Sequence, residues 1–353
     1  DSVADDREYK FQLWCLSLST GDVLWKRDCQ TAKPQVKRHS KSSHANPTPA
    51  TNGDYVVTSF ASEGVYCYSA DGELAWKKDF GFLDSGWFFD RAFQWGFASS
   101  PYIFEDTVYL QCDIQDQSFL VALDVKTGDE KWRTKRDDIP TWSSPVAYRD
   151  PSEKLRIAVN GTREAAVYDG EDGKRLWGLS GMSEIVVPTP QITPSYVMLA
   201  SGYRPIRPIL AVKHDAAGEL KAKADSDSED SDAFAWRLAT GGSYLPTPLI
   251  ADGYVHVVSN SGILSVFNAS TGKRVSRVRL RAVGSCTGSP VAADGKLYVT
   301  GENGKTVVVP LGPKQKPKST NEIGEAVLTT PAIAGGRLLI RGENHLFAIG
   351  AKK

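Results

Sequence analysis

The chain has 353 residues, of which 41% are apolar and 24% are charged, a balance that allows a large core without disulfides or metals. This composition excludes a disordered chain, and no apolar run approaches the roughly 18 residues of a membrane-spanning helix. Because 42 basic residues cancel 42 acidic ones, no net charge favours a nucleic-acid partner.

The first predicted elements are two strands between Phe11 and Asp28, joined by a turn at Gly21. The residues before them, Asp1 to Asp6, do not resemble a signal peptide. We therefore expect any targeting segment to lie upstream of this sequence or to have been removed.

A short sequence phrase then recurs seven times. It consists of Ser or Thr followed by a proline, then apolar residues and often a glycine turn, and in one copy Gly-Ser precedes the proline. Its prolines are spaced by 52, 44, 45, 58, 42 and 41 residues, and they are Pro49, Pro101, Pro145, Pro190, Pro248, Pro290 and Pro331. A repeat of about 40–45 residues is typical of a four-stranded propeller blade, and the longer spacings indicate insertions.

Each phrase leads into a strand of apolar or alternating residues, and turns that contain Gly, Asn or Asp mark the ends of that strand. The clearest examples are Tyr55–Thr58, Tyr254–Val258, Lys296–Thr300 and Arg337–Ile340.

A hairpin follows in most repeats, with a glycine turn and a tryptophan four residues later. The clearest copy runs from Val121 to Trp132, and related copies end at Trp25, Trp76 and Trp177, whereas a degenerate copy has Ser276 in the tryptophan position. Glycine allows the positive φ of the turn, and the aromatic ring suits packing between neighbouring blades.

The pattern A-x-D-x-x-T-G-x-x-x-W resembles the tryptophan-docking repeat of the pyrroloquinoline-quinone-like (PQQ-like) propeller superfamily, over nearly the whole chain. The superfamily includes quinoprotein alcohol dehydrogenases, the propeller lipoprotein of the outer-membrane barrel-assembly machinery, and bacterial propellers without assigned roles. The order of phrases from His44 to Gly350 is most similar to the third group. The resemblance implies an all-β fold, a single β-propeller domain over residues 1–353 with four-stranded antiparallel blades, in the periplasm or outside the cell.

Six complete blades are expected from Pro49 onward, and a three-strand remnant from Pro331 to about Gly350. We expect the ring to close with strands from both termini, which removes exposed sheet edges. Residues 11–28 supply one strand more than a seven-bladed closure needs. Two counts fit: seven blades with a spare strand, or eight blades whose first lacks its inner strands. We favour eight, because similar propellers begin with an extra inner-strand phrase.

In a propeller, the loops that enter the inner strands and those that join the second and third strands share the face around the axial funnel. Aromatic and arginine side chains on a concave face are typical of binding hot spots, although they also suit blade packing and ordinary solvated loops. The candidate partner- or ligand-binding residues on these loops and in the first insertion are His44, Trp87, Arg91, Trp95, Trp142, Arg163, Tyr203, Arg204, Arg207 and Tyr244.

Two insertions explain the longer spacings. The first, residues 80–98, has seven aromatics between Gly81 and Phe97, too many for a freely solvated loop, so we expect it to cover the funnel or to form an apolar contact patch. The second, residues 214–235, contains the acidic run Asp225–Asp232. This run lacks the glycine and terminal glutamate of an EF-hand calcium loop, and we expect a solvated, mobile hairpin tip.

Enzyme chemistry is disfavoured by the same residues. A quinoprotein dehydrogenase has an adjacent cysteine pair, whereas Cys15, Cys29, Cys67, Cys112 and Cys286 are far apart, with Cys15 and Cys29 the nearest potential pair. Gly284–Gly288 is only superficially similar to a nucleophile elbow. Of the five histidines, His44 is the one candidate acid or base. We predict no catalytic residue, cofactor or metal site.

The sequence thus favours a monomeric, non-catalytic binding or assembly scaffold of the bacterial envelope that recognises a protein or peptide. A quinoprotein-like oxidoreductase, or a sensor of a small molecule or glycan, remains the alternative.

Overall fold

The computed structural model describes residues 1–222 and 231–350. They divide into two compact units, Asp1–Ile185 with Ala217–Leu220, and Val186–Ala216 with Lys221–Lys353. The prediction of one domain stays a prediction. The described segments are built of strands and two short 3-10 helices, η1 (Ala61–Glu63) and η2 (Ser231–Ala233). None of their helices is long and apolar enough to cross a membrane.

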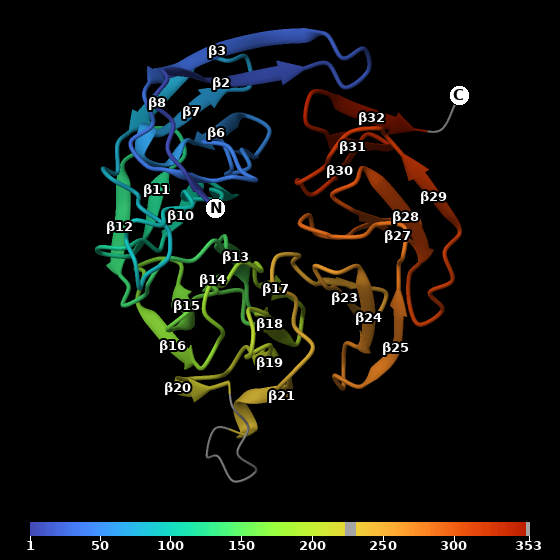
Figure 1. Ribbon diagram of the computed structural model, residues 1–353. Helices are drawn as coiled ribbons and strands as arrows, with labels where there is room; N and C mark the ends of the chain where they lie inside the picture. Colours follow the sequence, from blue (N-terminus) through green and yellow to red (C-terminus); the bar gives the residue numbers. More distant parts are fainter. Residues whose placement is uncertain (223–230, 351–353) are drawn as a thin grey trace. The chain divides into compact units, whose positions relative to one another are not determined.

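The first unit begins with two small antiparallel sheets. One pairs β1 (Ser2–Val3) with β4 (Arg38–His39), and the other pairs β2 (Tyr9–Leu16) with β3 (Val23–Ala32). Three blades follow in chain order (Figure 1). Blade 1 consists of β5 (Ala50–Thr51), β6 (Tyr55–Ser59), β7 (Val65–Ser69) and β8 (Leu74–Lys78). Blade 2 consists of β9 (Tyr102–Phe104), β10 (Thr107–Cys112), β11 (Phe119–Asp124) and β12 (Glu130–Lys135). Blade 3 consists of β13 (Val146–Arg149), β14 (Leu155–Val159), β15 (Ala165–Asp169) and β16 (Arg175–Ser180).

The second unit contains four further blades. Blade 4 consists of β17 (Gln191–Ile192), β18 (Tyr196–Ala200), β19 (Ile209–Lys213) and β21 (Phe234–Leu238). Blade 5 consists of β22 (Leu249–Ala251), β23 (Tyr254–Val258), β24 (Ile263–Asn268) and β25 (Arg274–Arg279). Blade 6 consists of β26 (Val291–Ala293), β27 (Lys296–Thr300), β28 (Lys305–Pro310) and β29 (Ser319–Glu322). Blade 7 has three strands, β30 (Ala332–Ala334), β31 (Arg337–Arg341) and β32 (Leu346–Gly350).

The structure has seven blades, so the prediction of eight is wrong. Each of the seven proline phrases supplies one inner strand, but no such strand joins β2 and β3, which form a sheet of only two strands. The remnant after Pro331 has three strands and ends at Gly350, as the sequence indicates. Closure of the ring by strands from both termini stays a prediction.

Part of the second insertion forms a strand that the sequence analysis did not predict. Its residues Gly218–Lys221 form β20, which lies beside β16 as a fifth strand of blade 3 (Figure 1). Arg175 of β16 forms ion pairs with Glu219 of β20 and with Glu164. Most of the acidic run, residues 225–230, lies outside the described residues. The expected hairpin tip and the comparison of this run with a calcium-binding loop therefore stay predictions.

The core consists of separate apolar clusters, each shared by consecutive sheets. Side chains of blades 1 and 2 pack together around Val57, Val108 and Val121, and those of blades 2 and 3 around Tyr109, Ile157 and Tyr168. Equivalent clusters join blades 4 and 5, and blades 5 and 6. Strands in the middle of the blades, such as β11 and β18, are apolar over nearly their whole length because both of their faces are covered.

Four hairpin tryptophans make the same contact with the next sheet along the chain. The indole Nε1 of Trp76 in blade 1 donates to the carbonyl oxygen of Val125 in blade 2 at 2.8 Å, and its ring lies against Gly128. A Cβ on Gly128 would lie 2.7 Å from that ring. The tryptophans that contact a hairpin glycine and donate to a nearby carbonyl in this way are Trp25, Trp76, Trp132 and Trp236.

We predict that Gly128→Ala lowers the free energy of unfolding by about 1–3 kcal/mol, because the new methyl group overlaps the Trp76 ring at a positive φ. Urea denaturation followed by tryptophan fluorescence measures the loss. Gly253→Ala is the matched control, since Gly253 has nearly the same φ, +74°, with open space around it. Equal losses in the two variants would contradict a specific role for the tryptophan contact.

Candidate functional site

The first insertion folds as a narrow loop between β8 and β9. The backbone N–H of Trp87 donates to the carbonyl of Phe93 at 2.8 Å, and that of Trp95 donates to the carbonyl of Ser85 at 2.8 Å. The two arms approach so closely at Gly86 that any Cβ there would overlap the carbonyl oxygen of Phe93. Glycine is therefore needed at this position for steric reasons.

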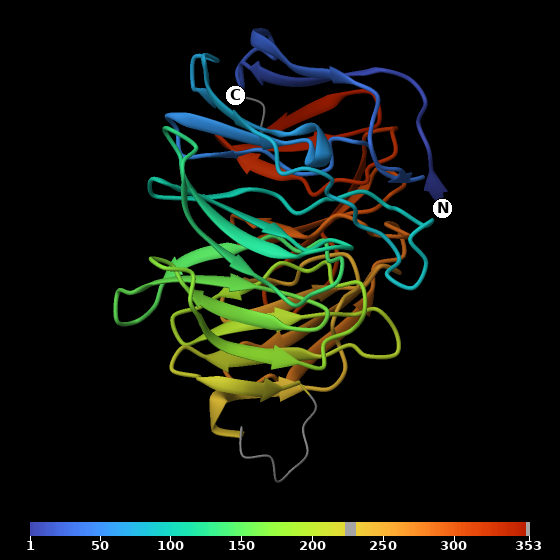
Figure 2. The ribbon, with the colours of Figure 1, turned by 90° about the vertical axis from the view of Figure 1, so that its left-hand side faces the viewer.

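On one side, this loop is bound to the N-terminal segment. The side-chain Oε1 of Gln94 accepts from the backbone N–H of Lys37 at 3.0 Å, and the backbone carbonyl oxygen of Gln94 accepts from the Ser2 hydroxyl at 2.7 Å. The N–H of His39 donates to the carbonyl of Trp95 at 3.0 Å. Figure 2 shows the N-terminal strand at the same end of the blades as this loop.

On the other side, the loop is bound to the connection between β10 and β11. The amide of Gln115 donates to the carbonyl of Trp87 at 3.1 Å, and its backbone N–H donates to the carbonyl of Asp84 at 2.9 Å. The hydroxyl of Ser85 donates to the carbonyl of Asp113 at 3.2 Å. Hydrogen bonds on both sides fix the backbone of the loop.

Aromatic side chains of the loop, together with Trp142 from the connection between β12 and β13, form what we call the aromatic platform: Trp87, Phe89, Phe93, Trp95 and Trp142. The Trp87 and Trp95 rings meet edge to face with centroids 5.7 Å apart, and Trp95 lies 5.8 Å from Trp142. The indole of Trp142 donates to the carbonyl of Gly96 at 2.8 Å. The outer members remain open to solvent, with Phe89 71% and Phe93 47% exposed.

Arg91 lies at the edge of the aromatic platform. Its guanidinium forms an ion pair with Asp116 at 3.0 Å and donates to the carbonyl of Gln115 at 3.1 Å. Both charged side chains are mostly exposed, so the pair adds little stability. Its main effect is to attach the tip of the loop to the β10–β11 connection.

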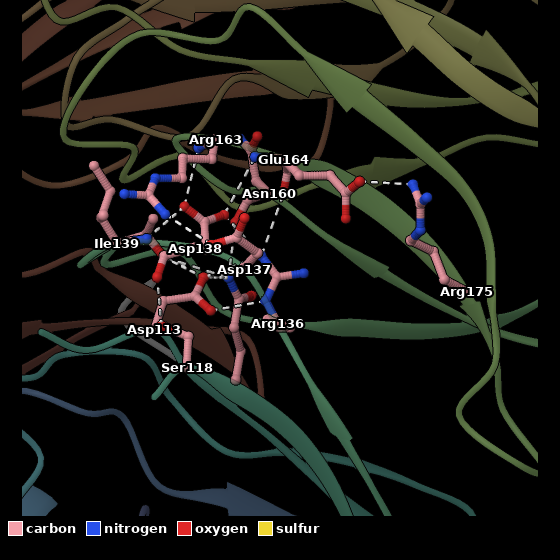
Figure 3. A network of polar contacts seen from close by, with 12 residues as sticks. Asp113, Ser118, Arg136, Asp137, Asp138, Ile139, Asn160, Arg163, Glu164 and Arg175 are labelled. Atoms are coloured by element: carbon pink, nitrogen blue, oxygen red, sulfur yellow. Dashed lines mark hydrogen bonds and ion pairs between the residues drawn. The ribbon is translucent and has the colours of Figure 1, made fainter. Parts of the chain in front are cut away.

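A buried ionic network lies next to the aromatic platform, where blades 2 and 3 meet (Figure 3). Arg136, just after β12, donates through Nε to Asp113 at 2.7 Å and through Nη2 to Asp138 at 3.0 Å. These three side chains are almost fully buried. Arg136 also donates to the hydroxyl of Tyr168 at 2.8 Å.

The two carboxylates of this network receive further hydrogen bonds from loops of both blades. Asp113 accepts from Gln111 at 2.6 Å and from the hydroxyl of Thr141, the neighbour of Trp142, at 2.7 Å. Asp138 accepts from the backbone N–H groups of Ile139 and Arg163, each at 2.9 Å. The network therefore fixes the loops that carry the platform residue Trp142 and the candidate Arg163.

Sequence reasoning missed this network as well as Gln94. Asp113 directly follows the buried strand β10, and that position was the available signal, whereas Arg136 and Asp138 follow β12, which is largely exposed. Asp113, however, lies 23 residues before Arg136, and Arg163, which donates to Asp138, lies 25 residues after it. The pattern along the chain therefore gives no indication that the side chains meet.

We predict that Arg136→Met lowers the free energy of unfolding by about 3–5 kcal/mol, because it leaves Asp113 and Asp138 buried without their cation. Arg133→Met, which breaks an exposed pair with Glu130, is the control and should cost less than about 1 kcal/mol. Chemical denaturation gives both values. A small loss for both variants would show that the buried charges are solvated in another way.

Asp138→Asn should be tolerated better than Arg136→Met. Burial, assisted by the charge of Asp113, raises the pKa of Asp138, so a neutral side chain suits this position. The Asp138→Asn variant also keeps the ion pair between Arg136 and Asp113.

His44, the candidate acid or base, has a structural partner. Its Nε2 lies 2.9 Å from the carboxylate of Asp5, its ring packs against Tyr9, and its side chain is 7% exposed. Asp5 also accepts from the Arg38 guanidinium at 2.7 Å and from the Tyr9 hydroxyl at 2.9 Å. This cluster attaches the segment between β1 and β2 to the loop that enters blade 1.

The hydrogen bond from Arg38 lowers the pKa of Asp5 to about 2, with His44 and Tyr9 adding to the effect and burial opposing it. Because the folded-state pKa lies below the ordinary value of 3.8, ionised Asp5 stabilises the fold above pH 4 or so, and this contribution is lost as the pH falls toward about 2. We predict that Asp5→Asn is less stable than the parent at pH 6, and that the difference disappears at acid pH.

Urea denaturation at a series of pH values tests this prediction. Asp6→Asn is the control, because the Asp6 carboxylate is almost fully exposed beside Lys33. A difference between Asp5→Asn and the parent that stays constant down to pH 2 or so would mean that Asp5 is not the titrating group.

The remaining candidates belong to the second unit. Tyr203 and Tyr244 pack with ring centroids 5.3 Å apart, so the second-to-third-strand loop of blade 4 meets the loop that enters blade 5. Burial raises the pKa of Tyr244 to about 12. Arg204 is exposed, and the carbonyl of Arg207 accepts from the N–H of Gly242 at 3.0 Å. That these four and the six candidates of the first unit surround one funnel stays a prediction.

The thiols are free and mostly buried. All five cysteines lack a disulfide, including Cys15 and Cys29, the nearest potential pair. Cys286, within the segment that superficially suggests a nucleophile elbow, is fully buried, and burial raises its pKa to about 12. In the part of the chain that the structure describes, no three His, Cys, Asp or Glu side chains gather in a way that suits a metal ion.

Comparison with known proteins agrees with this architecture. Residues 10–185 match the family described as outer membrane protein assembly factor BamB. The fold is similar to the crystal structure of BamB from Moraxella catarrhalis, with a TM-score of 0.60 and 15% identity over 93% of this chain and 85% of that one. It is also similar to the computationally designed protein Ika8, with a TM-score of 0.61 and 13% identity over 86% of this chain and 82% of that one.

Sequence comparison with curated proteins gives no match. The family match covers the two N-terminal sheets, except β1 and the first residue of β2, and blades 1 to 3. The structural likeness extends over both units and supports the propeller fold for the whole. The chain is therefore a PQQ-like β-propeller protein related to the outer-membrane assembly factor BamB.

Proposed function

We propose that this protein is a non-catalytic binding or assembly scaffold of the bacterial cell envelope, and that it recognises a protein or peptide through the aromatic platform. The observation that carries the proposal is the exposure of Phe89 and Phe93 on a loop whose backbone is held on both sides. Aromatic side chains on a fixed backbone bury a large apolar area and lose little conformational entropy on binding.

The relationship to an outer membrane protein assembly factor supports a protein partner and an envelope location, periplasmic or extracellular. In this proposal the protein is monomeric, and strands from both termini close its ring. Tyr203, Arg204, Arg207 and Tyr244 would then extend the surface that meets the partner around the funnel.

The chemistry of the aromatic platform favours an apolar contact over a charged one. Arg91 is already paired with Asp116, and Trp142 already donates its indole N–H to Gly96. What remains available is the ring surface of Phe89, Phe93 and Trp87. A partner with apolar or aromatic side chains matches that surface.

Pull-down from envelope extract, compared between the parent and Phe89→Ala/Phe93→Ala, tests the proposal. We expect the double variant to retain its specific partner at least about tenfold less, because exposed aromatic anchors contribute most of the binding energy. Both side chains are exposed, so the fold should be preserved, as thermal unfolding would verify. Trp87→Ala/Trp95→Ala removes the inner rings as well and should have a larger effect.

Leu24→Ala/Leu74→Ala provides the matched control, because both residues are exposed and apolar but lie on β3 and β8. Identical partner lists for the parent and both aromatic variants would exclude the aromatic platform as the contact. Stabilisation by one member of a small-molecule or glycan library, without any protein partner, would favour the sensor alternative.

A further inference from the structure

A second surface, on blade 5, is rich in positive charge, although the chain as a whole has no net charge. No aspartate or glutamate occurs in the 41 residues between Asp252 and Asp294, whereas five basic residues do. They fall on β25 and at its two ends: Lys273, Arg274, Arg277, Arg279 and Arg281.

The position of β25 in its sheet makes this charge accessible. The strand order β22-β23-β24-β25 leaves the outer edge of β25 unpaired (Figure 1). Arg274, Arg277 and Arg279 are all exposed. Arg277 lies opposite Ser265 and Arg279 opposite Ile263, so both point to the same face of the blade, about 7 Å apart along the strand.

These arginines have no acidic partners among the described residues. Arg279 donates only to the backbone carbonyl of Ser261, at 3.2 Å. The outer strand of blade 2 differs, because there Arg133 pairs with Glu130 at 2.6 Å and Lys131 with Asp124 at 3.6 Å. Charge on β12 is thus largely compensated, and charge on β25 is not.

Basic residues on an edge strand also discourage sheet-to-sheet aggregation. That purpose is served equally well by mixed charge, as on β12. A row of one sign has a further effect, since it creates a positive potential that attracts anionic groups. The tryptophan of the repeat is also replaced at this strand, by Ser276, and the chain therefore departs here from its own pattern.

We propose that the outer edge of β25 binds an extended acidic segment of a partner polypeptide. Backbone N–H and C=O groups of the free edge would pair with the segment, and its carboxylates, at every second position, would meet Arg277 and Arg279. An extended strand uses both the edge and the row of charges. A lipid surface would use the charges alone, which makes the polypeptide the better match.

The test measures binding of a fluorescent peptide with alternating glutamate and threonine to the full-length protein by anisotropy. A second peptide of identical composition, with its glutamates grouped together, reports on strand register. We expect the alternating peptide to bind more tightly, with an affinity that falls as salt is added. Arg277→Glu/Arg279→Glu should weaken its binding by about tenfold or more.

Lys77→Glu/Lys135→Glu is the matched control, because it makes the same change in net charge at exposed positions on the outer strands β8 and β12. This variant should bind like the parent, and so should Phe89→Ala/Phe93→Ala, which separates this surface from the aromatic platform. Thermal unfolding verifies that all variants fold.

Three results would overturn the proposal. Equal weakening in both charge variants would mean that net charge alone attracts the peptide. Equal binding of the two peptides would exclude pairing with the strand edge. Binding of phosphatidylglycerol vesicles that depends on Arg277 and Arg279, without binding of the alternating peptide, would assign the surface to a membrane.

Discussion

The contact between a hairpin tryptophan and the glycine of the next sheet is the interaction on which the blade arrangement depends. Each indole donates to a carbonyl and lies flat on a residue without a side chain, so that the ring meets backbone on its face and at its nitrogen. A register shift between the third and fourth strands, seen at Ala122/Leu123 and Val167/Tyr168, precedes the glycine turn in blades 1, 2, 3 and 5. The same register shift therefore recurs in these four copies of the repeat.

Where the repeat loses its tryptophan, another polar contact takes its place. Blade 5 has Ser276, and its link to blade 6 comes instead from fully buried His256, whose Nε2 accepts from the backbone N–H of Gly312 at 3.2 Å. Burial lowers the pKa of His256, which keeps the ring neutral and able to accept. The two surfaces to which we assign binding, the first insertion and the outer strand β25 with Ser276, both depart from the regular repeat.

The strands, hairpins and the aromatic insertion could be predicted from the sequence because each depends on neighbours in the chain. Tyr254–Val258 and Lys296–Thr300 are strands with those bounds. The blade count was wrong because β2 and β3 pair only with each other, and the residue pattern of neither strand indicates that no inner strand joins them. β20 escaped prediction for a related reason, since its partner β16 is distant in the chain. In the buried network, Asp113 likewise lies 23 residues before Arg136. For the first insertion the sequence predicted either a cover over the funnel or an apolar contact patch, but not its attachment through Gln94.

The fifth strand of blade 3 has a consequence for the order of events during synthesis. β20 is made after β17 to β19, strands of the second unit, yet it pairs with β16 of the first. A nascent chain that has emerged only as far as Ile185 therefore has an unpaired edge along β16, and Arg175 lacks its ion-pair partner Glu219. The first unit reaches its final form only after part of the second has left the ribosome, so the two halves do not mature strictly one after the other.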